Sequence, residues 1–445
     1  MKNKNLQLTI NALGTNGEGI ANTKAYTCFV PFCLPGEVVE ATANYCKGKI
    51  VYADLVKIKK AQNGRRSPKC KVFGLCGGCQ LQHMSYELQL QYKQNLVKNN
   101  LSKIGGINFD VLPTEPSAKQ YGYRNKLQIP ITKIGGKTAV GFYKSATHEI
   151  VPTPYCHLQE DWANKLCDIV CDFADENDVS VYDENKKTGL LRHIVARYAE
   201  GQLLATLVIN GDCLPCWQKL DEKLKTVFDD YGLFVNINKK HTNVILGQQT
   251  IHLSGIKQIY GTCCNIKYNL QPNSFFQVND DVREKIYDDA ISHTDCDCDI
   301  IIDAYSGIGI LSGVLAKSGK QVFGIEIVKD AVEDADKLKK LNGLSNLTNI
   351  CADVNIKLKQ LCDAYKAKKI SLVLDPPRKG LDKTTRDAIL FALPQKIVYI
   401  SCNSATLARD VKYLSQAYDL IYCKPYDMFP QTSNVETLVV LRKKS

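Results

Sequence analysis

The chain has 445 residues and a formal net charge of +11; 44% of its residues are hydrophobic and 23% are charged, a balance that excludes disordered and collagen-like polypeptides. At roughly 150 residues per domain, this length predicts about three domains. No apolar stretch approaches the roughly 18 residues of a membrane span, and none follows the basic N-terminus as a secretory signal would, so we expect neither a membrane partner nor secretion.

Short strands separated by glycine turns fill residues 1–58. Apolar or alternating stretches cover residues 6–12, 26–32, 38–45 and 49–58, with turn residues between them. Several short strands at this spacing predict a small β-barrel of the OB type. Barrels of this type often bind single-stranded nucleic acid, although many are only structural.

A basic region begins where the barrel ends. Residues 59–68 are polar and basic and contain glycine and proline, so we interpret them as a linker. From residue 59 to residue 126 the chain carries twelve Lys or Arg and three Asp or Glu. This concentration favours a polyanion partner, most simply nucleic acid, but a solvated basic face that serves solubility explains it equally well.

The middle of the chain, residues 69–265, has a mixed pattern and is predicted to form a central domain. One helix is expected at residues 86–103. Strands are expected at residues 126–132, 139–143, 192–198 and 203–209.

In the last part, residues 266–445, apolar strands alternate with helical stretches. The expected strands are residues 300–304, 322–327, 371–375 and 396–400, and the expected helices are residues 309–317, 331–342, 384–393 and 405–413. This alternation predicts a doubly wound, mostly parallel sheet with helices on both faces. The predicted fold class is therefore α/β, with a Rossmann-like C-terminal domain after a mixed central domain and an N-terminal barrel.

Cysteine usage points to a reducing compartment. Nineteen cysteines in 445 residues are too dilute for a disulfide scaffold, in which cysteine usually exceeds about 8–10% of the residues. We therefore expect a cytoplasmic protein whose thiols are mostly reduced.

Three of these cysteines are clustered. Cys70, Cys76 and Cys79 lie within ten residues, and the last two bracket a Gly-Gly turn, so their sulfurs could surround one soft metal centre. Cys156 is the best-placed fourth ligand. Zinc and iron–sulfur both fit this spacing, and buried free thiols are the alternative. The five residues between Cys70 and Cys76 count against radical cluster chemistry, whose motif has three.

A glycine turn suited to a nucleotide-derived cofactor follows the strand at 300–304. The turn holds Tyr305, Gly307 and Gly309 and leads into a helix, which lets the backbone approach a ligand closely. The next strand ends at Glu326, seventeen residues after Gly309, where a carboxylate could accept hydrogen bonds from ribose hydroxyls. These features do not separate a nicotinamide cofactor from S-adenosylmethionine.

Two further strands end in chemically useful residues at the same sheet edge. One ends in Asp375-Pro-Pro-Arg378, and the next delivers Cys402, a candidate nucleophile whose alternative is a structural thiol. Glu436, just before the terminal strand, is a candidate general base, although an isolated glutamate is usually solvated surface.

Together these motifs resemble those of the S-adenosylmethionine-dependent RNA uracil-5-methyltransferases. The resembling segments are residues 271–279, Asp303 to Gly309, Asp375 to Arg378, Ser401-Cys402-Asn403 and Asn434-Val-Glu436-Thr437, in the family's order. The barrel resembles the family's TRAM domain, and the set Cys70, Cys76, Cys79 and Cys156 resembles the 4Fe–4S ligands of members that modify 23S ribosomal RNA. Members that act on tRNA typically lack both features.

The resemblance implies the roles of individual residues. Cys402 would add to uracil C6, which makes C5 nucleophilic toward the methyl donor, and Glu436 would remove the C5 proton. The implied S-adenosylmethionine contacts are Gln277, Tyr305, Glu326 and Asp375. Some members carry phenylalanine at the place of Tyr305, and the cluster would be structural.

We therefore expect a monomeric enzyme that methylates C5 of a uridine in 23S ribosomal RNA. The alternatives are a tRNA uracil-5-methyltransferase and a non-catalytic iron–sulfur RNA-binding protein. An amino-group methyltransferase could use the acid-Pro-Pro turn, but it would have no use for Cys402.

Overall fold

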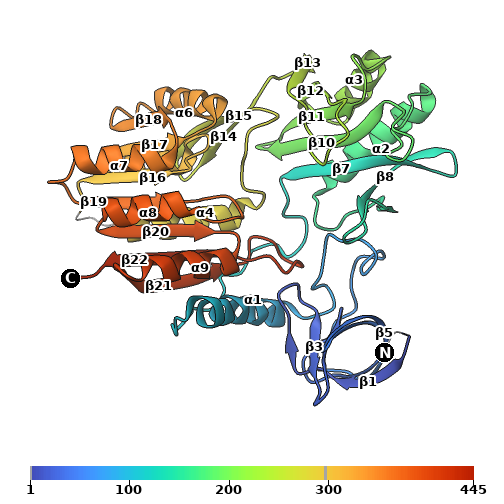
Figure 1. Ribbon diagram of the computed structural model, residues 1–445. Coiled ribbons are helices and arrows are strands. Elements are labelled where there is room, and N and C mark those ends of the chain that lie inside the picture. The colour runs from blue at the N-terminus through green and yellow to red at the C-terminus, as the bar shows by residue number, and fades with distance from the viewer. Residues whose placement is uncertain (1–2, 295–297) are drawn as a thin grey trace.

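A computed structural model describes residues 3–294 and 298–445 and contains three large β-sheets and a short two-stranded one (Figure 1). Within these described ranges, no helix has both the length and the apolar character that a membrane crossing requires.

The N-terminal sheet has six strands in the order β1-β5-β6-β4-β3-β2, and Figure 1 shows it curled into a barrel. Its strands are β1 (Asn5–Thr9), β2 (Ala12–Leu13), β3 (Gly19–Asn22), β4 (Thr27–Val30), β5 (Val38–Lys47) and β6 (Ile50–Lys60). Alternate residues such as Leu6, Leu8, Cys28 and Val30 point into the barrel and are buried. The barrel predicted from the alternation is confirmed.

The central sheet has seven strands in the order β13-β12-β11-β10-β7-β8-β9. They are β7 (Lys126–Ile134), β8 (Lys137–Tyr143), β9 (Ile150–Pro152), β10 (Leu191–Ala199), β11 (Gln202–Ile209), β12 (Asp230–Ile237) and β13 (Gln249–Gly255). Helices α2 (Asp161–Glu176) and α3 (Trp217–Lys225) pack on it and share one hydrophobic core with its strands.

The C-terminal sheet has seven strands in the order β18-β17-β16-β19-β20-β22-β21. They are β16 (Ile300–Ala304), β17 (Gln321–Glu326), β18 (Leu347–Cys351), β19 (Ile370–Leu374), β20 (Lys396–Ser401), β21 (Tyr418–Tyr426) and β22 (Glu436–Lys443). The first five in this order are parallel, and β22 runs antiparallel to both β20 and β21. The predicted α/β fold class is confirmed.

Helices cover both faces of this sheet, as predicted. One hydrophobic core includes residues of α4 (Asp280–His293), α5 (Ile310–Ala316) and α6 (Lys329–Leu341), together with the hairpin β14 (Ile259–Cys263) and β15 (Ile266–Leu270). The other core includes residues of α7 (Val354–Ala364), α8 (Lys383–Ala392) and α9 (Ser404–Leu414).

Helix α1 (Tyr86–Asn100) belongs in space to the C-terminal sheet, a placement that its position in the sequence did not predict. With one further helical turn, Leu101–Gly105, it packs on α9 and β21. Its N-terminal half also contacts the barrel, where the Tyr92 hydroxyl donates to the Thr15 carbonyl (2.9 Å). Helix α1 therefore joins the barrel to the C-terminal sheet (Figure 1).

The strand order places the candidate site. The direction of the strand order reverses at β16, which lies between β17 and β19, and ligands of open α/β sheets bind at the carboxyl ends of the strands beside such a point. The carboxyl ends of β16, β17, β19 and β20 therefore meet at one edge, and β22 begins there because it is antiparallel to β20.

Candidate active site at the carboxyl edge of the sheet

The turn between β16 and α5 is built from left-handed backbone. Tyr305, Gly307 and Gly309 have φ values of 66°, 54° and 81°, which lets the chain reverse from strand into helix within five residues. A Cβ atom at Gly309 would lie 2.8 Å from Ala335 Cβ, so glycine is required there by space as well as by conformation. The Tyr305 hydroxyl lies 3.4 Å from Thr385 Oγ1.

Glu326 is fixed beside this turn. Its Oε2 accepts the Gly307 N–H (3.1 Å), and its Oε1 accepts the N–H groups of Ile327 and Val328 (2.9 Å each). These hydrogen bonds hold the carboxylate at the end of β17, within reach of a ligand that lies on the turn. The structure thus brings together Glu326 and the glycine turn, as the sequence predicted.

Two more acids lie at the adjoining strand ends. Burial raises the pKa of Asp303 to about 7, as do the charges of Asp375 and Glu326, although a hydrogen bond from Ser312 opposes this. Burial also raises the pKa of Asp375 to about 7. The edge therefore concentrates carboxyl groups with little compensating charge, which suits a cationic ligand.

Cys402 and Glu436 lie side by side because of strand register. Ser401 pairs with Thr437 where β20 meets β22, so the next residue on one strand and the preceding residue on the other are neighbours at the edge. The Cys402 side chain is half-buried, whereas Glu436 is 2% exposed. Within the described residues, Glu436 Oε2 is buried and has no hydrogen-bond partner.

The electrostatics link these two residues to their neighbours. Burial, and then the charge of Glu436, raises the pKa of Cys402 to about 11, while Arg378 opposes the shift. Burial and the charge of Asp375 raise the pKa of Glu436 well above its ordinary value, and Arg378 again opposes the shift. The exposed Arg378 is thus a counter-charge for both groups. Arg378 ends the Asp375-Pro-Pro-Arg378 motif, but the sequence alone indicates no role for it.

Gln277 lies on the segment that leads into α4, and its described contacts are made by the backbone. Its carbonyl accepts from Asn125 Nδ2 (2.9 Å), and the N–H of Asn125 donates to the Val278 carbonyl (3.0 Å). Asn125 immediately precedes β7, so this segment lies between the central sheet and the C-terminal sheet. The cofactor role predicted for the Gln277 side chain stays a prediction.

The four predicted metal ligands line one cavity. Cys70, Cys76, Cys79 and Cys156 surround a space of about 80 Å³ together with Arg124 and several other residues. In the part of the chain that the structure describes, no group of three or more His, Cys, Asp or Glu side chains is arranged to hold a metal ion. The iron–sulfur cluster therefore stays a prediction.

The cavity is chemically unusual for free thiols. Burial raises the pKa of Cys79 to about 12 and raises the pKa of Cys76 and of Cys156 as well, and the Arg124 charge opposes all three shifts. Arg124 Nε is buried and has no hydrogen-bond partner among the described residues. A buried guanidinium beside four thiols suits an anionic group within the cavity. No sequence signal identified Arg124.

Known proteins match the whole chain. Residues 85–444 match the family model for tRNA (Uracil-5-)-methyltransferase, and residues 1–56 match that of the TRAM domain. An uncharacterized RNA methyltransferase of Caldanaerobacter subterraneus subsp. tengcongensis is 39% identical over 449 residues, 98% of each chain. One of Halalkalibacterium halodurans is 37% identical over 450 residues, which are 100% of this chain and 98% of that protein.

Among solved structures, the Pyrococcus abyssi tRNA (uracil-54, C5)-methyltransferase in complex with S-adenosyl-L-homocysteine superposes with a TM-score of 0.77. The match covers 98% of this chain and all of that one, at 26% identity. The protein thus belongs to the tRNA (uracil-5-)-methyltransferase family and is an S-adenosylmethionine-dependent RNA methyltransferase with an N-terminal TRAM domain.

Proposed function

We propose that this enzyme, acting as a monomer, methylates C5 of a uridine in 23S ribosomal RNA through a covalent bond between Cys402 Sγ and uracil C6. The observation that carries the proposal is the pairing of Cys402 with Glu436 at the edge that also holds the glycine turn and Glu326. A nucleophile, a base and a nucleotide-sized turn at one edge are what uracil C5 methylation requires.

Cys402 begins the reaction. Uracil C5 is too weak a nucleophile to attack a methyl group directly, so the Cys402 thiolate adds to C6, and the C5–C6 π electrons move toward O4 as an enolate. C5 then forms a bond to the methyl group as the enolate electrons return. S-adenosylmethionine supplies this methyl group on a positively charged sulfonium, which leaves as a neutral thioether.

Glu436 ends the reaction. Its carboxylate takes the proton from C5, the C5–H electrons re-form the C5–C6 double bond, and the Cys402 thiolate leaves C6. Burial supports this role, because a carboxylate whose pKa is raised holds a proton more strongly than an exposed one. Arg378 balances the charge of the departing thiolate.

Four residues are assigned to S-adenosylmethionine. We assign the ribose hydroxyls to Glu326, and we assign contacts with the rest of the cofactor to Gln277, Tyr305 and Asp375. The carboxyl groups of Asp303, Glu326 and Asp375 support binding of a sulfonium cation, since their fields add at the edge.

We further propose that Cys70, Cys76, Cys79 and Cys156 hold a 4Fe–4S cluster with a structural role. The shared cavity and the unpartnered Arg124 Nε support it. Protein purified without oxygen should then be brown, with broad thiolate-to-iron absorption and about four iron atoms per chain. A colourless protein with stoichiometric zinc would overturn this assignment.

Two RNA classes compete as substrates. The TRAM domain and the four cysteines support 23S ribosomal RNA, because they resemble features of the members that modify it. The Pyrococcus abyssi enzyme supports tRNA, because it acts on tRNA uracil-54 and aligns with 98% of this chain, the barrel region included. We favour 23S ribosomal RNA and treat tRNA as the second candidate.

Covalent trapping tests both the chemistry and the substrate. In RNA that contains 5-fluorouridine, the fluorine on C5 cannot be removed as a proton, so the adduct should persist on a denaturing gel. We expect an adduct on fragments of 23S ribosomal RNA and none with Cys402→Ala. An adduct on tRNA alone would select the second candidate, and no adduct on either RNA would contradict the covalent mechanism.

A further inference from the structure

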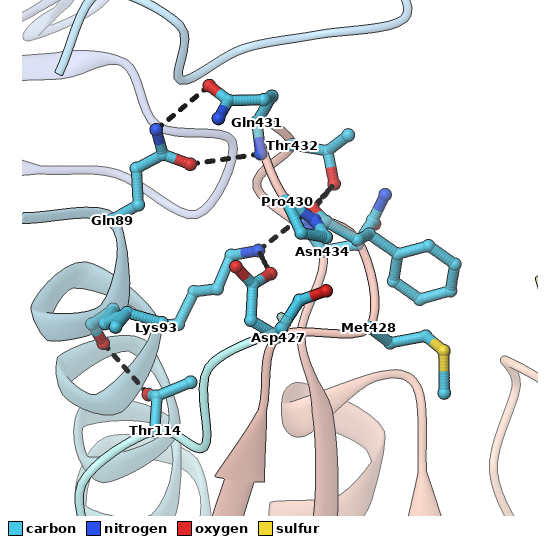
Figure 2. A network of polar contacts seen from close by, with 12 residues as sticks. Gln89, Lys93, Thr114, Asp427, Met428, Pro430, Gln431, Thr432 and Asn434 are labelled. Carbon is cyan, nitrogen blue, oxygen red and sulfur yellow. Dashed lines mark hydrogen bonds and ion pairs between the residues drawn. The ribbon is translucent and has the colours of Figure 1, made fainter. Parts of the chain in front are cut away.

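The segment of residues 427–434 joins β21 to β22 and ends two residues before Glu436 (Figure 2). It is buried along much of its length: Asp427, Met428 and Thr432 are at most 1% exposed. Two parts of the chain that are more than 300 residues away in sequence hold it in place.

Helix α1 holds the segment on one side. Lys93 is fully buried, forms an ion pair with Asp427 and donates to the Phe429 carbonyl (3.0 Å). Gln89 makes two hydrogen bonds with Gln431: its Nε2 donates to Gln431 Oε1, and its Oε1 accepts the Gln431 N–H (3.0 Å each). Figure 2 shows both pairs.

Two residues that are adjacent in sequence to cysteine-cavity residues also hold the segment. Gln80 follows Cys79 directly, and the Gln80 N–H donates to the Gln431 carbonyl (3.1 Å), while its Oε1 accepts the Ser433 N–H (3.2 Å). Tyr123 precedes the cavity residue Arg124, and its hydroxyl donates to the Pro430 carbonyl (3.1 Å).

The segment depends on these contacts because its backbone is unfavourable without them. Gln431 has a φ of 70°, a left-handed conformation that a non-glycine residue adopts at a cost. Glu436 has a buried Oε2 without a hydrogen-bond partner among the described residues, so its position depends on the backbone that carries it. That backbone is set by β22 and by this segment.

Cys402 is anchored by a different element. It precedes α9, whose N-cap Asn403 accepts the N–H groups of Ala405 (3.0 Å) and Thr406 (3.3 Å) through Oδ1. The start of α9 contacts the C-terminal end of α1, where Asn100 Nδ2 donates to Ser404 Oγ (2.8 Å), but Gln89 lies near the other end of α1. Loss of the Gln89 or Tyr123 contacts would therefore loosen the 427–434 segment and displace the base while leaving the nucleophile in place.

We propose that Gln89, Lys93 and Tyr123 are positioning residues that set Glu436 for removal of the C5 proton. The inference rests on the proposed roles of Cys402 and Glu436. It makes the last step of the reaction depend on the docking of α1, and of the residues next to the cysteine cavity, against the 427–434 segment.

Single-turnover kinetics with a radiolabelled methyl donor test the proposal, because they separate formation of the methylated covalent adduct from its breakdown. Tyr123→Phe removes one hydroxyl without changing shape, and Gln89→Leu removes the paired hydrogen bonds. The matched control is Tyr418→Phe: its buried hydroxyl also donates to a proline carbonyl, that of Pro394 (2.9 Å), but at the opposite edge of the sheet.

We expect adduct breakdown to slow by roughly fivefold to tenfold in Tyr123→Phe, the cost of about one hydrogen bond, and by more in Gln89→Leu. Methyl transfer to the RNA should not slow, because Glu436 acts after it and the Glu436 charge only opposes ionisation of Cys402. RNA affinity should stay within about twofold of wild type. Tyr418→Phe should match wild type in both steps.

Unchanged breakdown in Tyr123→Phe would overturn the positioning role, as would equal slowing of methyl transfer and breakdown. Glu436→Gln serves as the reference. If it traps the adduct and Tyr123→Phe breaks the adduct down at the wild-type rate, the positioning inference alone is wrong. If Glu436→Gln releases product at the wild-type rate, the proposed base is wrong and the inference is overturned with it.

Discussion

In the proposed mechanism, Cys402 must lose its proton before it can attack uracil C6. Because burial and Glu436 raise its pKa to about 11, the thiolate fraction is small at neutral pH and grows about tenfold with each pH unit below that pKa. We therefore predict that adduct formation with 5-fluorouridine RNA becomes roughly tenfold faster per pH unit between about pH 7 and pH 9. Quenched time courses at each pH would measure it.

Arg378→Met provides the control for this prediction. Arg378 lowers the pKa of Cys402 against the effect of burial, so its loss should slow adduct formation at every pH below the thiol pKa. If the rate of adduct formation does not change with pH, the pKa of Cys402 is lower than its burial implies.

The residue patterns identified Cys402 and Glu436 separately, and only the family resemblance implied that they act on one base. Each residue was visible as a polar group at a strand end. Their proximity follows from the antiparallel register of Ser401 with Thr437, which depends on the direction of β22. The counter-charge of Arg378 likewise needs the folded edge, since the sequence gives no measure of its distance from either residue.

Helix α1 could be predicted from the sequence, but its packing partner could not. Residues 86–103 were predicted as a helix from their pattern, and α1 with its extra turn covers 86–105. The buried face of the helix includes Val97 and Leu101, which would suit any apolar surface. Its partner, the C-terminal sheet, is determined by tertiary packing. Helix α2, whose buried residues recur at helical spacing, was not recognised.

The ion pair of α1 gives a stability prediction. Lys93 and Asp427 are both fully buried, so Lys93→Met leaves an unpaired carboxylate without solvent. We predict a loss of about 3–5 kcal/mol in the free energy of unfolding, measured by urea denaturation of the methyltransferase domain within the full chain.

The double variant Lys93→Met with Asp427→Leu tests the cause of that loss. Replacing both partners by apolar groups removes the buried charge, so much of the lost stability should return. If the double variant is no more stable than Lys93→Met, helix packing rather than the unpaired charge accounts for the loss.

In the folded molecule, not every basic side chain of residues 59–126 is available at the surface to bind RNA. Lys93 is buried in its ion pair, and Arg65 is bound to the buried Glu37 through two hydrogen bonds, 2.6 and 2.7 Å long. Arg66, Lys69 and Lys71 are exposed along the loop that carries Cys70, so their charges are accessible to RNA phosphates. Arg66 also donates to two backbone carbonyls, and Lys69 lies over the Tyr121 ring.

We predict that these three residues contribute to the salt dependence of RNA binding. Replacing Arg66, Lys69 and Lys71 by alanine should reduce the slope of log affinity against log salt by about 0.7–0.9 for each lost phosphate contact. The control triple Lys366, Lys368 and Lys369 is equally exposed but lies at the opposite edge of the C-terminal sheet. If both variants have the same slope, the basic loop does not contact RNA phosphates and is a solvated face.

The strand patterns predicted the order of the barrel, the central domain and the C-terminal sheet along the chain. They did not predict the contacts between these parts. The barrel and the C-terminal strands alternate or run apolar in ways that a sequence displays. By contrast, the 427–434 segment is held by Gln89 and Tyr123, whose partners are more than 300 residues away. Such long-range polar contacts carry no local signal.

Cys402 and Glu436 are proposed to act on opposite sides of one covalent intermediate. The most direct test incubates unmodified substrate RNA with a radiolabelled methyl donor and resolves the products on a denaturing gel. Glu436→Gln keeps the nucleophile but removes the base, so a methyl-labelled complex of protein and RNA should accumulate. Cys402→Ala should give neither the complex nor methylated RNA. A folded, cofactor-binding Glu436→Gln without that complex, or a complex that persists in Cys402→Ala, would contradict the account.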